Sequence, residues 1–184
     1  MIIKFHDIYG DDPGIISPLF MNIYKLEPGQ AVFIPAGEIH AYVSGTGFEI
    51  MANSDNVIRG GLTPKHIDPE VLLDITNFKS SGPALVDPLK TKNENTYLTP
   101  AEEFVFSVIN LEKGLYRKKD TGKSLEMFFC YSGTAKVVLC SDKLLPSSEK
   151  LFIFRKGDCF MIPSSVSCYE IAGDSILYRA AVRK

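Results

Sequence analysis

The chain has 184 residues, 45% of them hydrophobic, with a formal net charge of −2 at pH 7 and a pI near 5.9. The apolar fraction suits one or two small folded domains, and the near-neutral charge excludes a basic surface for nucleic acid or for an anionic membrane. The first residues lack the features of a signal peptide, and no segment reaches the ~20 apolar residues of a membrane span, so the sequence predicts a cytoplasmic protein.

The first 26 residues predict a short stub and one strand. The turn-forming run at residues 9–14 limits what precedes it to a stub. Apolar residues then recur through residues 16–26, a pattern that predicts a strand leading into a turn at Pro28 and Gly29.

A buried strand and a second turn follow, and they end just before His40. The apolar run at residues 31–34 predicts the strand, and Pro35 and Gly37 end it. A histidine at a strand end can offer one ring nitrogen to a metal while a neighbour holds the other. A lone histidine between two apolar residues also suits a hydrogen-bonded core side chain, so these residues alone leave both interpretations open.

Two short apolar runs, residues 41–43 and 48–52, flank a Ser-Gly-Thr-Gly sequence and predict a hairpin. This hairpin would bring Tyr42 and Glu49 near His40. Glu49 interrupts an apolar strand, so its carboxylate either faces solvent by simple alternation or faces the site.

One helix is predicted at residues 69–78, because Asp68 is a good N-cap and Pro69 suits the first helical position. A connection rich in Pro, Lys and Asn then places a domain boundary between residues 85 and 86. Strands recur in the second half, as in a sandwich or barrel, at residues 103–108, 124–131, 135–140, 150–154, 159–162, 167–171 and 175–182.

The cysteines are Cys130, Cys140, Cys159 and Cys168, all in the second half. Since no two have Cys-x-x-Cys spacing and each stands in an apolar context, we expect buried free thiols rather than a metal site or disulfides.

The spacing of Gly29, Pro35, Gly37 and His40 resembles the second sequence motif of the cupin barrels, whose histidine is a metal ligand. Residues 49–68, which include the run Ser-Asp-Asn-Val-Ile-Arg-Gly-Gly-Leu-Thr-Pro-Lys, closely resemble the type I mannose-6-phosphate isomerases. These are zinc enzymes that interconvert mannose 6-phosphate and fructose 6-phosphate. The resemblance is dense from about residue 14 to residue 78 and is faint beyond it.

The resemblance implies an all-β fold of two jelly-roll (cupin) barrels, the N-terminal one incomplete, with one short α-helix. Residues 1–85 would form the partial barrel that carries the active-site motif, and residues 86–184 would form the second barrel. In the second half, Gly157 and Pro163 repeat the turn spacing of the first motif, but Cys168 stands at the histidine position. We therefore expect the second barrel to lack metal ligands.

The resemblance also implies which residues carry the chemistry. An aldose–ketose interconversion moves a proton between neighbouring carbons, so its site needs a base, an electrophile and a cation near the developing oxyanion. Without the resemblance, several of these side chains would be ordinary loop residues. The implied set is His40 as metal ligand, Arg59, Tyr42, Glu49 and Asp55 as catalytic residues, and Lys65 together with Arg59 as substrate-binding residues.

In the family, the zinc is held by a Gln-x-His pair, a glutamate and the histidine that His40 matches. No Gln-x-His pair precedes the motif in this chain, so we expect the C-terminal part of an isomerase, with a sugar phosphate as substrate and a separate N-terminal half or a second copy as partner. Glu38 and Glu49 are the nearby acids that could assist His40, and we expect weak zinc binding at most. The alternative is a catalytically inactive double-cupin remnant that serves as a sugar-phosphate binding or structural module.

Overall fold

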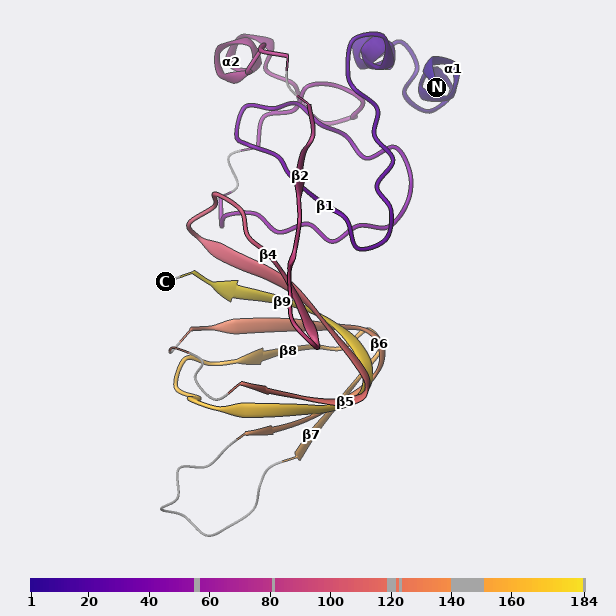
Figure 1. Cartoon of the computed structure of the whole chain (residues 1–184). Helices are drawn as coiled ribbons and strands as arrows, with labels where there is room; N and C mark the ends of the chain where they lie inside the picture. The colour runs from indigo at the N-terminus through magenta and orange to yellow at the C-terminus, as the bar shows by residue number, and fades with distance from the viewer. Residues whose placement is uncertain (55–56, 81, 119–121, 123, 140–150, 184) are drawn as a thin grey trace. The chain divides into compact units, whose positions relative to one another are not determined.

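The computed structural model describes residues 1–54, 57–80, 82–118, 122, 124–139 and 151–183 (Figure 1). Most of its regular structure is β, as expected. The chain divides into two compact units: the N-terminal unit, residues 1–49 and 53–86, and the C-terminal unit, residues 50–52 and 87–184. Within the described ranges, no helix is both long and apolar enough to cross a membrane.

The N-terminal unit has little regular structure and little buried surface. Its strands β1 and β2 form an antiparallel two-stranded sheet, with Val32 opposite Leu85. Phe5 is the only buried residue among those described in this unit. Its elements are α1 (Ile2–Tyr9), the 3-10 helix η1 (Pro13–Leu19), β1 (Ala31–Phe33), α2 (Pro69–Ile75) and β2 (Ala84–Val86).

Two predictions for the start of the chain are wrong. The expected stub is the eight-residue helix α1, so the described chain has two α-helices where one was expected. The expected strand at residues 16–26 is replaced over its first part by η1. Asp12 begins η1 by accepting a hydrogen bond from the Gly14 N–H at 2.7 Å, with Pro13 at the first position. This local capping decides the conformation over the alternating apolar pattern.

The hairpin expected at residues 41–43 and 48–52 is also absent from the described residues. A strand needs a neighbouring strand to satisfy its backbone groups, and β1–β2 is the only strand pair found in the described part of this unit.

Helix α2 begins as predicted and ends early. The Asp68 carboxylate accepts a hydrogen bond from the Val71 N–H at 3.1 Å. The helix ends at Ile75 rather than Phe78, because the Asn77 N–H donates to the Gly37 carbonyl at 2.8 Å. This bond joins the end of α2 to the turn that precedes His40.

The C-terminal unit is one antiparallel seven-stranded sheet in the order β3-β4-β5-β9-β6-β7, with β8 paired to β6. The long strands β5, β6 and β9 bend sharply, so that their two halves lie one above the other (Figure 1). The strands are β3 (Leu89–Lys90), β4 (Glu94–Tyr97), β5 (Phe104–Lys118), β6 (Glu126–Leu139), β7 (Leu151–Arg155), β8 (Cys159–Ile162) and β9 (Tyr169–Val182).

Glycines explain why pairs of predicted strands are single bent strands. Gly133 has φ 75° in β6, and Gly173 has φ 137° in β9. A side chain at Gly133 would collide with the Asp174 carbonyl oxygen, and one at Gly173 with the Thr134 carbonyl oxygen. The glycine predicted to end a strand therefore allows two neighbouring strands to approach closely while the ladder continues through a bulge.

Apolar residues of β5, β6, β8 and β9 form the core. Phe160 stacks between Phe128, at a centroid distance of 4.7 Å, and Phe154, at 4.0 Å. The buried members are Ile109, Leu111, Phe128, Cys130, Ala135, Val137, Ile162, Tyr169, Ile171 and Leu177.

The cysteine prediction holds for one residue. Cys130 is a buried free thiol, whereas Cys159 is free but exposed. Cys168 is disulfide-bonded, contrary to the expectation. Cys140 lies outside the described residues.

A network of charged and polar side chains lies inside the C-terminal unit. Arg179 is 5% exposed and pairs with Glu126 at 2.8 Å and with Glu94 at 2.9 Å. The Tyr169 hydroxyl donates to Glu126, and the Tyr116 hydroxyl donates to Glu94 at 2.9 Å. A buried cation thus compensates two carboxylates that would be costly to bury alone.

Candidate functional site

His40 lies directly after the turn that follows β1, and its ring is exposed. Its Nδ1 is 3.0 Å from the Glu38 carbonyl oxygen. Because a carbonyl only accepts hydrogen bonds, Nδ1 carries the proton in the neutral ring, and Nε2 is then the nitrogen with a lone pair. The ring is thereby held in the tautomer that can bind a metal through Nε2.

Tyr42 lies beside this histidine, and Glu49 lies beside Tyr42. The Tyr42 ring meets the His40 ring edge to face at a centroid distance of 6.1 Å. Partial desolvation, together with the Glu49 carboxylate that accepts a hydrogen bond from the phenol, raises the pKa of Tyr42. Tyr42 therefore stays protonated at neutral pH and acts as a hydrogen-bond donor rather than as a base, although the residue is 73% exposed.

The segment that carries Arg59 lies against the residue before His40. A Cβ added at Gly60 would be 3.3 Å from the Ile39 side chain, so only a glycine fits this approach without displacement. Arg59 is half-buried and Lys65 is exposed. Asp55, the remaining predicted site residue, lies outside the described residues.

The donor atoms of this region do not form a metal site by themselves. Among the residues that the structure describes, no group of three or more His, Cys, Asp or Glu side chains could hold an ion. His40 offers one nitrogen, and the Glu49 carboxylate is engaged by Tyr42. Catalytic zinc normally has three protein ligands, so the described donor set does not fit zinc without ligands from elsewhere.

Asp12 was missed when the sequence alone was considered. Its carboxylate accepts hydrogen bonds from the backbone N–H groups of Gly14, Leu62 and Thr63, which joins the start of η1 to the segment after Arg59. The Asp-Pro pair that begins η1 was a usable signal for the capping bond. Nothing local indicates the two bonds to residues some fifty positions later.

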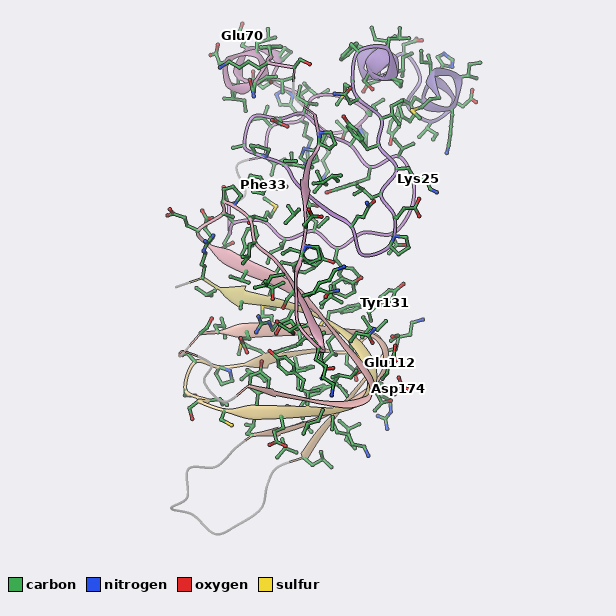
Figure 2. All side chains as sticks on the ribbon, in the orientation of Figure 1. Lys25, Phe33, Glu70, Glu112, Tyr131 and Asp174 are labelled. Atoms are coloured by element: carbon green, nitrogen blue, oxygen red, sulfur yellow. The ribbon has the colours of Figure 1, made fainter. Side chains whose placement is uncertain are left out.

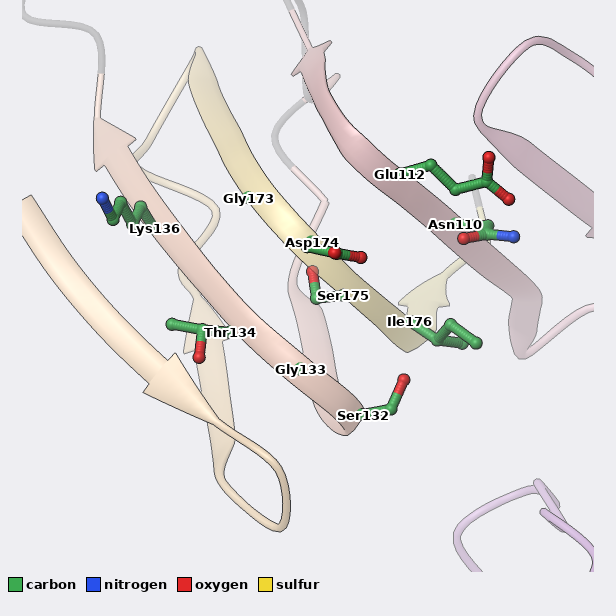
Figure 3. Close-up of a pocket in the computed structure, with 10 residues that line it drawn as sticks. All are labelled: Asn110, Glu112, Ser132, Gly133, Thr134, Lys136, Gly173, Asp174, Ser175 and Ile176. Atoms are coloured by element: carbon green, nitrogen blue, oxygen red, sulfur yellow. The ribbon is translucent and has the colours of Figure 1, made fainter.

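A shallow depression of about 760 Å³ lies in the C-terminal unit, where Gly133 and Gly173 stand on the neighbouring strands β6 and β9 (Figure 3). Glu112 and Asp174 lie on the same side of that unit (Figure 2). Lys136 and Thr134 from β6 also line it. Among the predicted site residues that the structure describes, none lines it.

The chain is similar to mannose-6-phosphate isomerases along most of its length. It is 35% identical over 175 residues to the enzyme of Salmonella typhimurium, covering 94% of this chain and 42% of that protein. It is 39% identical over 153 residues to the Escherichia coli enzyme, and 34% identical over 188 residues to mannose-6-phosphate isomerase 2 of Arabidopsis thaliana. No family model matches the chain.

Solved structures agree with these sequence relatives. The Salmonella typhimurium mannose 6-phosphate isomerase bound to its substrate fructose 6-phosphate and to zinc superposes with a TM-score of 0.84 at 32% identity. The apo form of that enzyme also gives a TM-score of 0.84. Both comparisons cover 100% of this chain and 45% of the solved chain. The chain therefore spans less than half the length of the relatives that it matches, and over that span it is homologous to the mannose-6-phosphate isomerases.

Proposed function

We propose that this chain supplies part of the active site of a mannose-6-phosphate isomerase. The observation that carries the proposal is the match of the whole chain, at 32% identity, to a solved isomerase that binds fructose 6-phosphate and zinc. The position of Ile39 against Gly60 supports it, because this contact brings the segments of His40 and Arg59 together.

The roles of the individual residues follow from the reaction. Isomerisation passes through an enediol-type intermediate, and a guanidinium such as Arg59 can stabilise the oxyanion that develops as it forms. Lys65 is an exposed cation suited to the phosphate. Tyr42, whose O–H donates to Glu49, can accept a hydrogen bond from a sugar hydroxyl at its phenol oxygen, and Asp55 is proposed as an acid at the mouth of the site.

We propose that His40 provides one zinc ligand and that the other ligands come from polypeptide outside this chain, either a separate N-terminal half or a second copy. The lone pair on Nε2 and the incomplete donor set among the described residues support this division. On this proposal, residues 1–85 are a partial cupin barrel and residues 86–184 are a second barrel without metal ligands. The cytoplasmic location remains a prediction.

The test is an isomerase assay with mannose 6-phosphate. We define the remainder polypeptide as the part of the Salmonella typhimurium enzyme outside the region matched here. The chain alone should have little activity, and the mixture with the remainder polypeptide should turn over substrate. His40→Ala should lower the activity of the mixture on the order of a hundredfold, whereas the exposed control His66→Ala should not.

Two outcomes would contradict the proposal. A mixture that folds and associates but has no turnover would favour the inactive sugar-phosphate binding or structural module. Full activity of His40→Ala would remove the proposed ligand from the site.

A further inference from the structure

Asp12 joins two segments of the N-terminal unit that are far apart in sequence. Its Oδ1 accepts a hydrogen bond from the Gly14 N–H at 2.7 Å. The same carboxylate accepts bonds from the backbone N–H groups of Leu62 and Thr63. A helix cap would need only the first of these bonds. The other two hold residues 61–63 against the start of η1.

The packing around this carboxylate is tight. A Cβ added at Gly14 would lie 2.9 Å from Asp12 Oδ1 and 3.1 Å from the Leu62 nitrogen. One added at Gly61, where φ is 137°, would lie 3.2 Å from the same oxygen. Among the described residues, Leu62 is the one residue other than glycine with positive φ, at 53°. Such a conformation persists only where the surroundings enforce it, and the bonds from Asp12 do so.

The segment held in this way carries both proposed substrate cations. Arg59 lies two residues before Gly61, and Lys65 lies two residues after Thr63. The Thr63 Oγ accepts a hydrogen bond from the Lys65 N–H at 3.2 Å, which extends the bonded chain from Asp12 to Lys65. On the other side, Gly60 packs against Ile39 beside His40.

We propose that Asp12 is a positioning residue that fixes residues 59–65 so that Arg59 and Lys65 meet an anionic sugar phosphate together. This role rests on the proposed function. Asp12 itself does not touch substrate, because its carboxylate is occupied by three backbone N–H groups. It acts by fixing the backbone from which both cations extend.

The charge of Asp12 is consistent with this role. Burial opposes ionisation, but the three backbone bonds outweigh it and lower the pKa of Asp12 below its ordinary value. The carboxylate is therefore ionised at neutral pH, and its bonds are lost only as pH falls through that lowered pKa.

The test measures fructose 6-phosphate binding by NMR titration to the chain mixed with the remainder polypeptide. Asp12→Ala should weaken binding about tenfold or more, Asp12→Asn should weaken it less because one oxygen remains, and the neighbouring exposed control Asp11→Asn should stay within about twofold. Thermal unfolding of each variant verifies that it is folded at the titration temperature.

A double-mutant cycle separates positioning from general destabilisation. If Asp12 acts through Arg59, the Asp12→Ala effect should shrink below about threefold in an Arg59→Ala background. Undiminished, additive effects would overturn the inference. Amide hydrogen exchange adds a readout that needs no ligand: Asp12→Ala should speed exchange at Leu62 and Thr63 about tenfold or more while Ile109 is unchanged.

The outcomes separate the two proposals. A wild-type mixture that binds fructose 6-phosphate with an affinity that Asp12→Ala leaves unchanged would overturn the positioning role alone. A wild-type mixture that associates but binds no sugar phosphate would overturn the proposed function, and the role of Asp12 toward substrate with it. Unchanged exchange at Leu62 and Thr63 would show that Asp12 does not hold this segment.

Discussion

The two units differ in the burial and pairing of their charged and polar side chains. In the C-terminal unit, Arg179 and Glu126 are almost completely buried, and each charge is satisfied within the unit. In the N-terminal unit, His40, Tyr42 and Lys65 are exposed, and the described acids near His40 do not complete a metal site. The first arrangement stabilises a fold. The second supports the proposal that these groups act together with ligands and polypeptide from outside the chain.

Apolar residues show the same difference. The C-terminal unit buries a continuous core between its bent strands. The N-terminal unit leaves large apolar side chains exposed, including Leu19 and Phe20, each more than two-thirds exposed. Where such side chains form a contiguous patch, they mark an interaction site, and we propose that a partner contacts this unit.

The largest expected effect tests the buried network. Arg179→Met should destabilise the protein by about 3–5 kcal/mol, because it leaves Glu126 and Glu94 buried without their cation. Urea unfolding at pH 7 measures this loss. The exposed control Arg155→Met should change the free energy of unfolding by less than about 0.5 kcal/mol. Equal losses of unfolding free energy for the two variants would show that the buried network contributes no more to stability than an exposed arginine.

A second pair tests the close approach of the neighbouring strands β6 and β9 at Gly133. Gly133→Ala should cost about 2 kcal/mol or more, because the added methyl meets the Asp174 carbonyl in addition to the unfavourable positive φ. Gly157→Ala shares a positive φ but has open space around it, and should cost about 1 kcal/mol. Thermal unfolding of both variants gives the difference between the two losses of stability. A larger loss at Gly157 would contradict the close approach of the two strands at Gly133.

A third pair compares one tyrosine from each unit. Tyr169→Phe removes a buried hydroxyl that donates to Glu126 and should cost about 1–3 kcal/mol. Tyr42→Phe removes an exposed phenol bonded to Glu49 and should change stability by less than about 0.5 kcal/mol. If Tyr42 has its proposed role, Tyr42→Phe should instead lower the isomerase activity of the mixture with the remainder polypeptide. Similar stability losses at both positions would contradict the view that only the C-terminal unit depends on its tyrosine hydroxyl for stability.

The smallest expected effect is the pH dependence of the C-terminal unit. Burial, followed by the bonded Glu126 carboxylate, raises the pKa of Tyr169 above its ordinary value near 10. The folded state therefore keeps a proton that the unfolded state loses, and stability present below pH 10 declines above it by about 1.4 kcal/mol per pH unit. The free energy of unfolding, measured between pH 8 and 11, gives this slope. The slope should be less steep for the Tyr169→Phe variant. An unchanged slope would exclude Tyr169 as its source.

Local signals predicted the elements that depend on few residues. Strand β8 was predicted from an apolar run, and the start of α2 was predicted from Asp68 and Pro69. The structure confirms both. The spacing around His40 indicated the candidate site for the same reason, since the turn and the histidine are neighbours in sequence.

Long-range contacts were beyond such signals. The buried ion pair joins Glu126 to Arg179, 53 residues away in the sequence, and no local pattern indicates it. The hydrogen bonds that the Leu62 and Thr63 N–H groups donate to Asp12 likewise depend on the folding together of segments far apart in the sequence. The predicted strand at residues 16–26 failed because one capping bond, from the Gly14 N–H to Asp12, outweighed an alternating pattern.

Zinc content tests the central claim, that this chain holds one part of a shared metal site. The purified chain and its mixture with the remainder polypeptide are each dialysed against a chelator and analysed for zinc. The account predicts almost no zinc on the chain alone and about one zinc per complex in the mixture. Zinc that stays on the isolated chain at about one per chain would contradict it.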